Sequence, residues 1–329
     1  MLKASIGSAT ALLALCGTAF AQPAGITAEM INTTLPLEGA PLAVPGPYQT
    51  MSEPTFGKPG LILFRPTNLD AFPARDKLPV LVWGNGGCGI DTTRYGGFLS
   101  TIVSHGFIAI GTVPLEGAAP PQGAAPQQGG APQAGAPRRQ ATADDLRGAI
   151  DWAFAENGRA GSPLNGKIDT TQVAVMGQSC GGFLSIGLGA DPRVDTIGVF
   201  NSGVTPPNPN APANPNAQAN ASRPTMDSLK NLHGPVLLIN GHERDFLMGA
   251  SKATFDAINH VPAFYGARHG AGHTATVFHP GGGEYANVAS NWLKWQFKKD
   301  AAASKMFVGD DCSLCTNSNW DTESKGFGK

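Results

Sequence analysis

The segment GQSCG at residues 177–181 places a serine between two glycines. Gly-x-Ser-x-Gly between a strand and a helix is typical of a nucleophile elbow, a sharp turn that exposes the serine hydroxyl. The apolar run at 173–176 and the small-residue stretch at 181–189 supply that strand and that helix. Cys180 is also a potential nucleophile. It would begin the helix, however, so its side chain turns elsewhere, and Ser179 is the predicted nucleophile.

This nucleophile needs a general base, because a serine hydroxyl reacts poorly near neutral pH. In the chain order typical of such sites the base follows the last strand. Candidates in that part of the chain are His260, His269, His273 and His279. His273 follows the small residues GAG, which let a loop approach the serine, so it is the predicted base. His269 lies nearer the preceding strand and is the second choice.

A carboxylate should hold the imidazole in one tautomer and stabilise its protonated form. The segment LLINGHERDFL ends a predicted strand and offers two acids, Glu243 and Asp245. The acid usually lies a few residues beyond that strand, which favours Asp245, and Glu243 stays open as the alternative. The resulting order Ser179, Asp245, His273 is the one expected of an elbow-type site.

Acyl transfer also needs two N–H groups aimed at the developing oxyanion. The backbone amide of Cys180, directly after the nucleophile, is the first predicted donor. The glycine-rich loop GNGGCG at 84–89 lets backbone approach without side-chain obstruction. The Gly87 amide is therefore the second predicted donor, and the neighbouring Cys88 amide could replace it.

These residues follow short apolar runs that read as buried strands. Strands, some running into their loops, are predicted at 60–66, 78–89, 107–114, 172–182, 195–203, 234–245 and 262–273, with helices at 93–106, 142–158 and 284–300. Such alternation predicts an α/β fold with a mostly parallel central sheet covered by helices on both faces. Ligands of such sheets bind at the carboxyl ends of the strands, where all the candidate loops would gather.

The chain ends lie outside this pattern. Residues 1–21 have a lysine, a short apolar run and the cleavage-site pattern AFA, which indicate a secretory signal peptide. A lipoprotein signal, with Cys16 at the new terminus, is disfavoured by the large Leu15 before it. The catalytic domain is expected over 22–300, and 301–329 are assigned to a polar tail that carries a CxxC motif.

Two segments inside the domain are low in complexity. Residues 116–141 are rich in Ala, Pro, Gln and Gly, and residues 205–225 in Asn, Pro and Ala. Neither can bury enough apolar area to offset its ordering entropy, so both are predicted to be extended loops near the rim of the site. Passive insertions are favoured over lids, because neither segment contains large apolar residues.

Removal of the signal peptide would leave Cys88, Cys180, Cys312 and Cys315. An even number of cysteines in an exported chain favours disulfides, and four cysteines allow three connectivities. A Cys88–Cys180 pair is one hypothesis, since it would join the two loops of the oxyanion hole and leave Cys312 with Cys315. The latter pair could instead be a redox or zinc motif, but it has no second pair or nearby histidine.

The overall composition restricts the partners. The formal net charge of the 329 residues is −1, which does not favour nucleic acid or an anionic membrane. No later segment has about 20 uninterrupted apolar residues, so transmembrane anchoring is not expected. The chain is predicted to be secreted or periplasmic and to act without a metal or other cofactor, since no histidine spacing matches H-E-x-x-H.

The motifs GQSCGG and GAGH resemble the α/β-hydrolase superfamily over about residues 58–300, and within it the dienelactone-hydrolase-like and secreted cutinase- or polyester-hydrolase-like branch. The chain departs from that pattern in three places. Ser179 stands where dienelactone hydrolases have cysteine, Asn85 stands where many relatives have histidine, and the loop from Gly241 to Asp245 is one residue longer than usual.

The resemblance implies an α/β-hydrolase fold and a serine esterase that needs no cofactor and cleaves a small-molecule or polymeric ester. A polyester depolymerase or a peptidase using the same three residues is the alternative within enzymes. A non-catalytic binding protein on the same fold is the alternative of another class.

Overall fold

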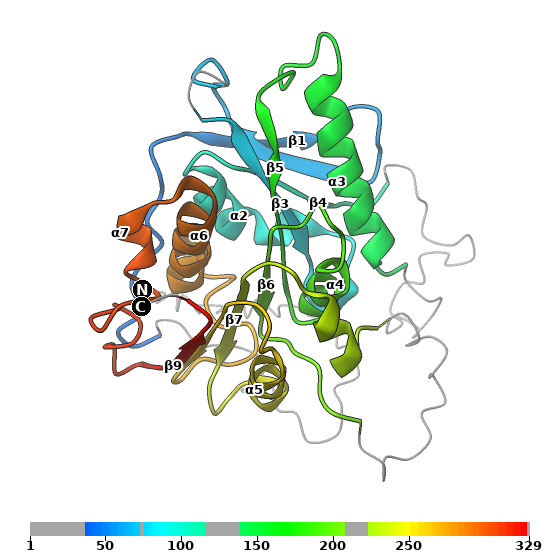
Figure 1. Ribbon diagram of the computed structural model, residues 1–329. Helices are drawn as coiled ribbons and strands as arrows, with labels where there is room; N and C mark the ends of the chain where they lie inside the picture. Colours follow the sequence, from blue (N-terminus) through cyan, green and yellow to red (C-terminus); the bar gives the residue numbers. More distant parts are fainter. Residues whose placement is uncertain (1–36, 73–75, 116–138, 208–222, 328–329) are drawn as a thin grey trace, which may run out of the picture.

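A single nine-stranded sheet organises the protein (Figure 1). The computed structural model describes residues 37–72, 76–115, 139–207 and 223–327. The strand order is β1-β2-β4-β3-β5-β6-β7-β8-β9. The strands are β1 (Thr50–Pro54), β2 (Leu61–Pro66), β3 (Leu78–Gly84), β4 (Ile108–Thr112), β5 (Ile168–Gln178), β6 (Thr196–Phe200), β7 (Val236–Gly241), β8 (Ala263–Arg268) and β9 (Trp320–Lys325).

The sheet is mostly parallel. The six strands β4, β3, β5, β6, β7 and β8 run parallel to one another, whereas β1 pairs antiparallel with β2, β2 with β4, and β9 with β8. β3 is buried at every position, as expected of a central strand covered on both faces. The carboxyl ends of the parallel strands therefore meet along one edge of the sheet.

Helices cover both faces. They are α2 (Gly96–Val103), α3 (Ala143–Gly158), α4 (Cys180–Leu188), α5 (Met248–Ala257), α6 (Gly283–Lys298) and the short α7 (Ala301–Ser304). One core cluster joins the sheet to α3, α4 and α5 through Ile150, Ile186 and Phe255. The other joins it to α2 and α6 through Ile102 and Trp292, and Figure 1 shows the two helix groups on opposite sides. The predicted α/β layering is thus confirmed.

The helix predicted at 142–158 forms as α3. The Thr142 hydroxyl accepts the N–H of Asp145, and the Asp145 carboxylate accepts the N–H of Thr142, so two N–H groups at the helix start are satisfied. Leu146 and Ile150, four residues apart on one face of the helix, are buried against the sheet. Local capping and core burial therefore favour the same helix.

The C-terminal segment differs from its assignment as a tail. Residues 320–325 form β9, which pairs with β8 along six residues, and the side chains of Phe307, Leu314 and Trp320 are buried. The sequence WDTESK carries little apolar signal, because an edge strand with one buried side chain is held mainly by backbone hydrogen bonds. Strand β1 and helix α5 were also not assigned from the sequence.

Some expectations concern residues outside the described ranges. The signal peptide over 1–21 lies there, as do 116–138 and 208–222 from the two low-complexity segments. Within the described part of the chain, no helix has the length and apolar character needed to cross a membrane.

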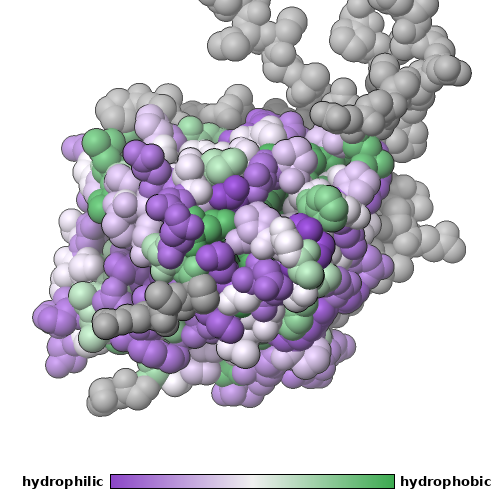
Figure 2. Space-filling model, turned by 90° about the horizontal axis from the view of Figure 1, so that it is seen from above, coloured by the Kyte–Doolittle hydropathy of each residue, from purple (hydrophilic) through white to green (hydrophobic). Residues whose placement is uncertain are grey.

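The surface is mixed in character. Figure 2 views the end of the sheet near the C-terminus of α3, where hydrophilic residues predominate and hydrophobic areas are small. Among the described residues, the exposed large hydrophobic side chains belong to four separate segments, of which only the first contributes two: Leu42 with Val44, Phe56, Leu115 and Phe278. Single exposed apolar side chains of this kind are normal on a protein surface.

Candidate active site

The turn between β5 and α4 consists of Ser179 alone. Its backbone has φ 55° and ψ −118°, a conformation that is strained for a residue with a side chain. A Cβ atom at Gly177 would lie 2.4 Å from the Gly181 carbonyl, and one at Gly181 would lie 2.0 Å from the Gly84 oxygen. Gly177 is therefore required for β5 to approach α4 this closely, and Gly181 for α4 to approach β3. The result is a partly exposed serine at the carboxyl edge of the sheet.

Ser179 and His273 meet at this edge. The Ser179 Oγ lies 2.8 Å from the His273 Nε2, and the His273 Nδ1 lies 2.8 Å from the Asp245 Oδ1. A carboxylate only accepts hydrogen bonds, so Nδ1 carries the proton and Nε2 is left to accept from the serine hydroxyl. The structure thus brings together the predicted nucleophile, base and acid.

The Asp245 carboxylate is buried and held by several donors. Its Oδ2 accepts from the Asn201 Nδ2 at 2.8 Å and from the Gly241 N–H at 3.2 Å. Its Oδ1 accepts from the Leu247 N–H at 3.1 Å as well as from His273. These contacts fix the orientation of a charge that would otherwise be costly to bury. The Phe246 ring covers the imidazole of His273, with centroids 4.1 Å apart.

The alternative residues lie in another arrangement. The Glu243 Oε1 accepts the N–H of Gly270, and its Oε2 lies 2.9 Å from the His242 Nδ1. The His269 Nε2 lies 3.1 Å from the Asp321 Oδ1 on β9. The hydrogen bonds of Glu243 are therefore directed to His242 and Gly270, and that of His269 to Asp321, rather than to Ser179 or His273.

This second arrangement has its own electrostatics. The hydrogen bond from His269, followed by the charges of His269 and His242, lowers the pKa of Asp321. Burial raises the pKa of Glu243, but its hydrogen bonds with backbone N–H groups and His242 outweigh burial and leave the pKa lowered. Ligand atoms of His242, Glu243 and His269 lie within 4.8 Å of one another. Two imidazoles and a carboxylate are donors that could hold a cation such as Zn²⁺.

The loop after β3 supplies N–H groups beside the serine. Residues Gly86–Cys88 form a 3-10 helix in which Gly87 has φ 62°. The Gly86 N–H donates to the Tyr95 hydroxyl at 2.8 Å. The Gly89 N–H donates to the Gly86 carbonyl at 3.1 Å and closes this turn. The choice of the Gly87 amide over the neighbouring Cys88 amide stays a prediction.

Two disulfides are present in the described chain. Cys88 is bonded to Cys180 across 92 residues, and Cys312 is bonded to Cys315. The hypothesis of a Cys88–Cys180 pair is thus confirmed, and the CxxC motif forms a local disulfide. The first bond joins the loop after β3 to the first residue of α4, so it links the backbone segments that carry both predicted oxyanion donors.

Sequence reasoning missed several residues that organise this edge. Asn201, directly after β6, adopts φ 48° and donates to Asp245. Tyr95 and Gln178 form hydrogen bonds to the loops on both sides of Ser179. A polar residue at the end of a buried parallel strand, or directly after it, was a usable signal for Gln178 and Asn201. Nothing local marked Tyr95, whose hydroxyl reaches this edge from the turn before α2.

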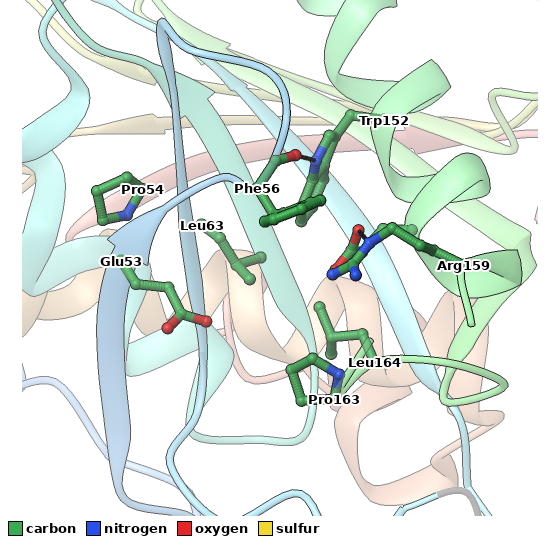
Figure 3. Close-up of a pocket in the computed structure, with 9 residues that line it drawn as sticks. Glu53, Pro54, Phe56, Leu63, Trp152, Arg159, Pro163 and Leu164 are labelled. Atoms are coloured by element: carbon green, nitrogen blue, oxygen red, sulfur yellow. Dashed lines mark hydrogen bonds and ion pairs between the residues drawn. The ribbon is translucent and has the colours of Figure 1, made fainter. Parts of the chain in front are cut away.

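A pocket of about 250 Å³ lies elsewhere, between the β1–β2 hairpin and the end of α3 (Figure 3). Its polar groups satisfy one another: the Trp152 Nε1 donates to the Phe56 carbonyl, and Arg159 pairs with Glu156 while stacking on the Phe56 ring. Leu164, also in its lining, precedes β5, whereas Ser179 follows it. This pocket is thus at the opposite end of β5 from the serine and contains none of the site residues.

Comparison with known proteins gives no match, either to a family model or to a curated protein. The chemistry has therefore to be judged from the geometry of the site itself. A hydroxyl in contact with an imidazole, which is in turn oriented by a buried carboxylate, can lose its proton as it attacks an electrophilic carbon. Two adjacent backbone N–H groups could stabilise an oxyanion formed in that attack.

Proposed function

We propose that the protein is a serine hydrolase of the α/β-hydrolase fold that cleaves carboxylic esters through an acyl-enzyme. The observation that carries this proposal is the pair of 2.8 Å contacts linking Ser179, His273 and Asp245. The elbow between a parallel strand and a helix, and the chain order serine, acid, histidine, both support it.

In the first half-reaction, the Ser179 Oγ attacks the ester carbonyl carbon while its proton moves to the His273 Nε2. The N–H groups of Cys180 and Gly87 stabilise the negative carbonyl oxygen of the tetrahedral intermediate. The bond from this carbon to the alkoxy oxygen then breaks, and His273 protonates the leaving alcohol. The product is an ester between Ser179 and the acyl group.

Water repeats the sequence in the second half-reaction. His273 removes a proton from the attacking water, and the second tetrahedral intermediate collapses to release the carboxylic acid. Ser179 recovers its proton from the imidazole. Throughout, Asp245 keeps the Nδ1 proton of His273 in place and stabilises the imidazolium. The two half-reactions require no metal or organic cofactor.

The export proposed from the sequence agrees with the two disulfides, because disulfides persist in oxidising compartments. We therefore place the enzyme in the periplasm or outside the cell. Its substrate would be a small-molecule or polymeric ester reaching the exposed Ser179 side of the sheet.

The direct test is Ser179→Ala, assayed on p-nitrophenyl butyrate and labelled with a fluorophosphonate. We expect wild type to turn over the ester and to be labelled on Ser179. The variant should lose at least about a thousandfold in kcat and all of the label. Ser304→Ala, which removes a hydroxyl on α7 bonded to the Ala301 carbonyl, is the matched control. Wild-type turnover by Ser179→Ala would refute the proposal.

The same assay separates the possible substrates. A polyester film and a peptide amide are tested beside the soluble ester, since each presents a carbonyl that an activated serine can attack. Release of soluble acid from the film would identify a depolymerase, and cleavage of the amide would identify a peptidase. A folded wild-type protein that neither turns over any of these nor takes the fluorophosphonate would instead favour a binding protein.

A further inference from the structure

A directional chain of hydrogen bonds connects three loops at the carboxyl edge of the sheet. The Gly86 N–H donates to the Tyr95 Oη at 2.8 Å, and the Tyr95 hydroxyl donates to the Gln178 Oε1 at 3.2 Å. The Gln178 Nε2 then donates to the His273 carbonyl at 2.9 Å. The chain begins at a backbone N–H, which only donates, and ends at a backbone carbonyl, which only accepts. The directions of all three bonds are therefore fixed.

The surroundings hold this chain in place. Tyr95 and Gln178 are both buried, and the Tyr95 ring packs against Trp83 and Phe278 with centroid distances of 5.2 and 5.0 Å. A Cβ atom at Gly86 would lie 2.2 Å from the Gln178 Oε1, so the chain occupies space that a side chain would need. Burial also raises the pKa of Tyr95, which keeps its hydroxyl protonated and able to donate.

We propose that Tyr95 and Gln178 are positioning residues that align the Gly87 amide and the His273 imidazole with Ser179. This inference rests on the function proposed above and deepens it. Tyr95 fixes the Asn85–Gly86 peptide group, which directly precedes the peptide group that carries the N–H of Gly87, the proposed oxyanion donor. Gln178 fixes the backbone of His273, the proposed base, and is itself the residue before the nucleophile.

Such alignment matters because the reaction tolerates little displacement. Oxyanion donors act at about 2.7–3.1 Å from the oxygen, and a shift of about 1 Å costs on the order of a hundredfold in rate. The loop that carries Gly87 is rich in glycine, the residue that restricts the backbone least. The Cys88–Cys180 disulfide attaches one end of this loop to α4, and the Tyr95 hydroxyl holds the other end at Gly86.

The first test is Tyr95→Phe, which removes one oxygen and keeps the packed ring. With p-nitrophenyl butyrate we expect kcat to fall about 10- to 100-fold, with KM changed by less than about threefold, because ground-state binding is not altered. The rate of fluorophosphonate labelling of Ser179 should fall in parallel. Tyr48→Phe is the matched control, since the Tyr48 ring packs on Phe72 away from the site, and it should keep wild-type kcat.

A double-mutant cycle shows whether the two residues act as one unit. Gln178→Leu should lower kcat by a similar factor, since it removes both bonds of the amide. The kcat of the double variant Tyr95→Phe/Gln178→Leu should then be little lower than that of the more impaired single variant, because either change breaks the same chain. Fold losses that multiply would show two independent effects and overturn the inference.

The outcomes distinguish this inference from the function beneath it. A wild-type protein without turnover or labelling would refute the proposed function, and the positioning role with it. An active wild type with unchanged kcat in Tyr95→Phe would overturn the positioning role alone. Titration of active sites supplies the remaining control: a loss due only to misfolding lowers the titrated fraction and leaves kcat per site unchanged, which would also overturn it.

Discussion

Two histidine–carboxylate groups are built from the same two loops of this protein. The inner group consists of Asp245 from the loop after β7 and His273 from the loop after β8. The outer group begins two to four residues earlier on these loops. It contains His242 and Glu243 from the first loop, His269 from the second and Asp321 from β9.

The groups use the same residue types but differ in burial and partners. The side chains of the inner group are 8% and 0% exposed, whereas those of the outer group range from 25% to 60%. Buried charges are weakly screened and need fixed donors, and Asp245 has them in Asn201 and two backbone N–H groups. Exposed pairs gain little from contact. Residue type and spacing alone therefore do not identify the pair that lies beside Ser179.

The largest expected effect tests the inner group directly. Asp245→Asn should keep the packing of the loop but favour the wrong tautomer of His273, lowering kcat by about 10⁴-fold. The matched variant Glu243→Gln changes the neighbouring acid in the same way and should alter kcat by less than about threefold. Both are measured on p-nitrophenyl butyrate at neutral pH. Equal losses in the two variants would remove the distinction between the groups.

The disulfides extend the comparison to covalent links. The variant Cys88→Ser/Cys180→Ser should lose about 2–5 kcal/mol in the free energy of unfolding, because the bond closes a long loop of the unfolded chain. Its kcat should also fall, since the bond holds the proposed oxyanion loop. Cys312→Ser/Cys315→Ser removes a bond spanning three residues and should cost much less stability and no activity. The free energy of unfolding is measured in urea, and kcat on p-nitrophenyl butyrate. Larger losses in Cys312→Ser/Cys315→Ser than in Cys88→Ser/Cys180→Ser would contradict the expected ranking.

A smaller effect on kcat is expected from removing the Asn201 side chain, which holds the carboxylate of Asp245. Asn201→Gly keeps the left-handed backbone of this position but removes the amide that donates to Asp245. Loss of one hydrogen bond to a buried charge is worth about 1.5–3 kcal/mol, so kcat should fall by roughly ten- to a hundredfold if that bond orients the acid during the reaction. Asn165→Gly, on a distant exposed turn, is the control. An unchanged kcat would show that the backbone donors suffice.

The smallest effect concerns the outer group. The hydrogen bond from His269 lowers the pKa of Asp321 in the folded protein. The ionised carboxylate therefore contributes to stability above the pKa of about 3.9 in the unfolded chain, and this contribution is lost as the pH falls through the lower pKa of the folded protein. Asp321→Asn should therefore cost about 1 kcal/mol or less at pH 5.5, with the difference from wild type vanishing near pH 2 and shrinking in 1 M salt. Urea unfolding measures this, with exposed Asp310→Asn as control. A pH-independent difference would contradict the assignment.

The predicted α/β layering could be read from the sequence because each buried strand is a run of apolar residues and α3 has both a cap and an apolar stripe. β9 could not, because Trp320 is its one buried residue and backbone pairing with β8 stabilises it. The turn at Ser179 was predictable because its glycine-flanked pattern is local, and Gly177 is required by contact with Gly181 four residues later, although Gly181 is required by contact with Gly84 on β3. The reactive role assigned to this turn stays a prediction until Ser179→Ala is assayed.

By itself the sequence determined the elements that must be local: the strands, the capped helix, the glycine-flanked serine and the order in which serine, acid and histidine follow one another. Only the tertiary structure decided between Asp245 and Glu243 and between His273 and His269. Members of each pair lie two or four residues apart on one loop, so their surroundings come from distant segments. Asn201 after β6 orients the inner carboxylate, and Asp321 on β9 engages the outer histidines.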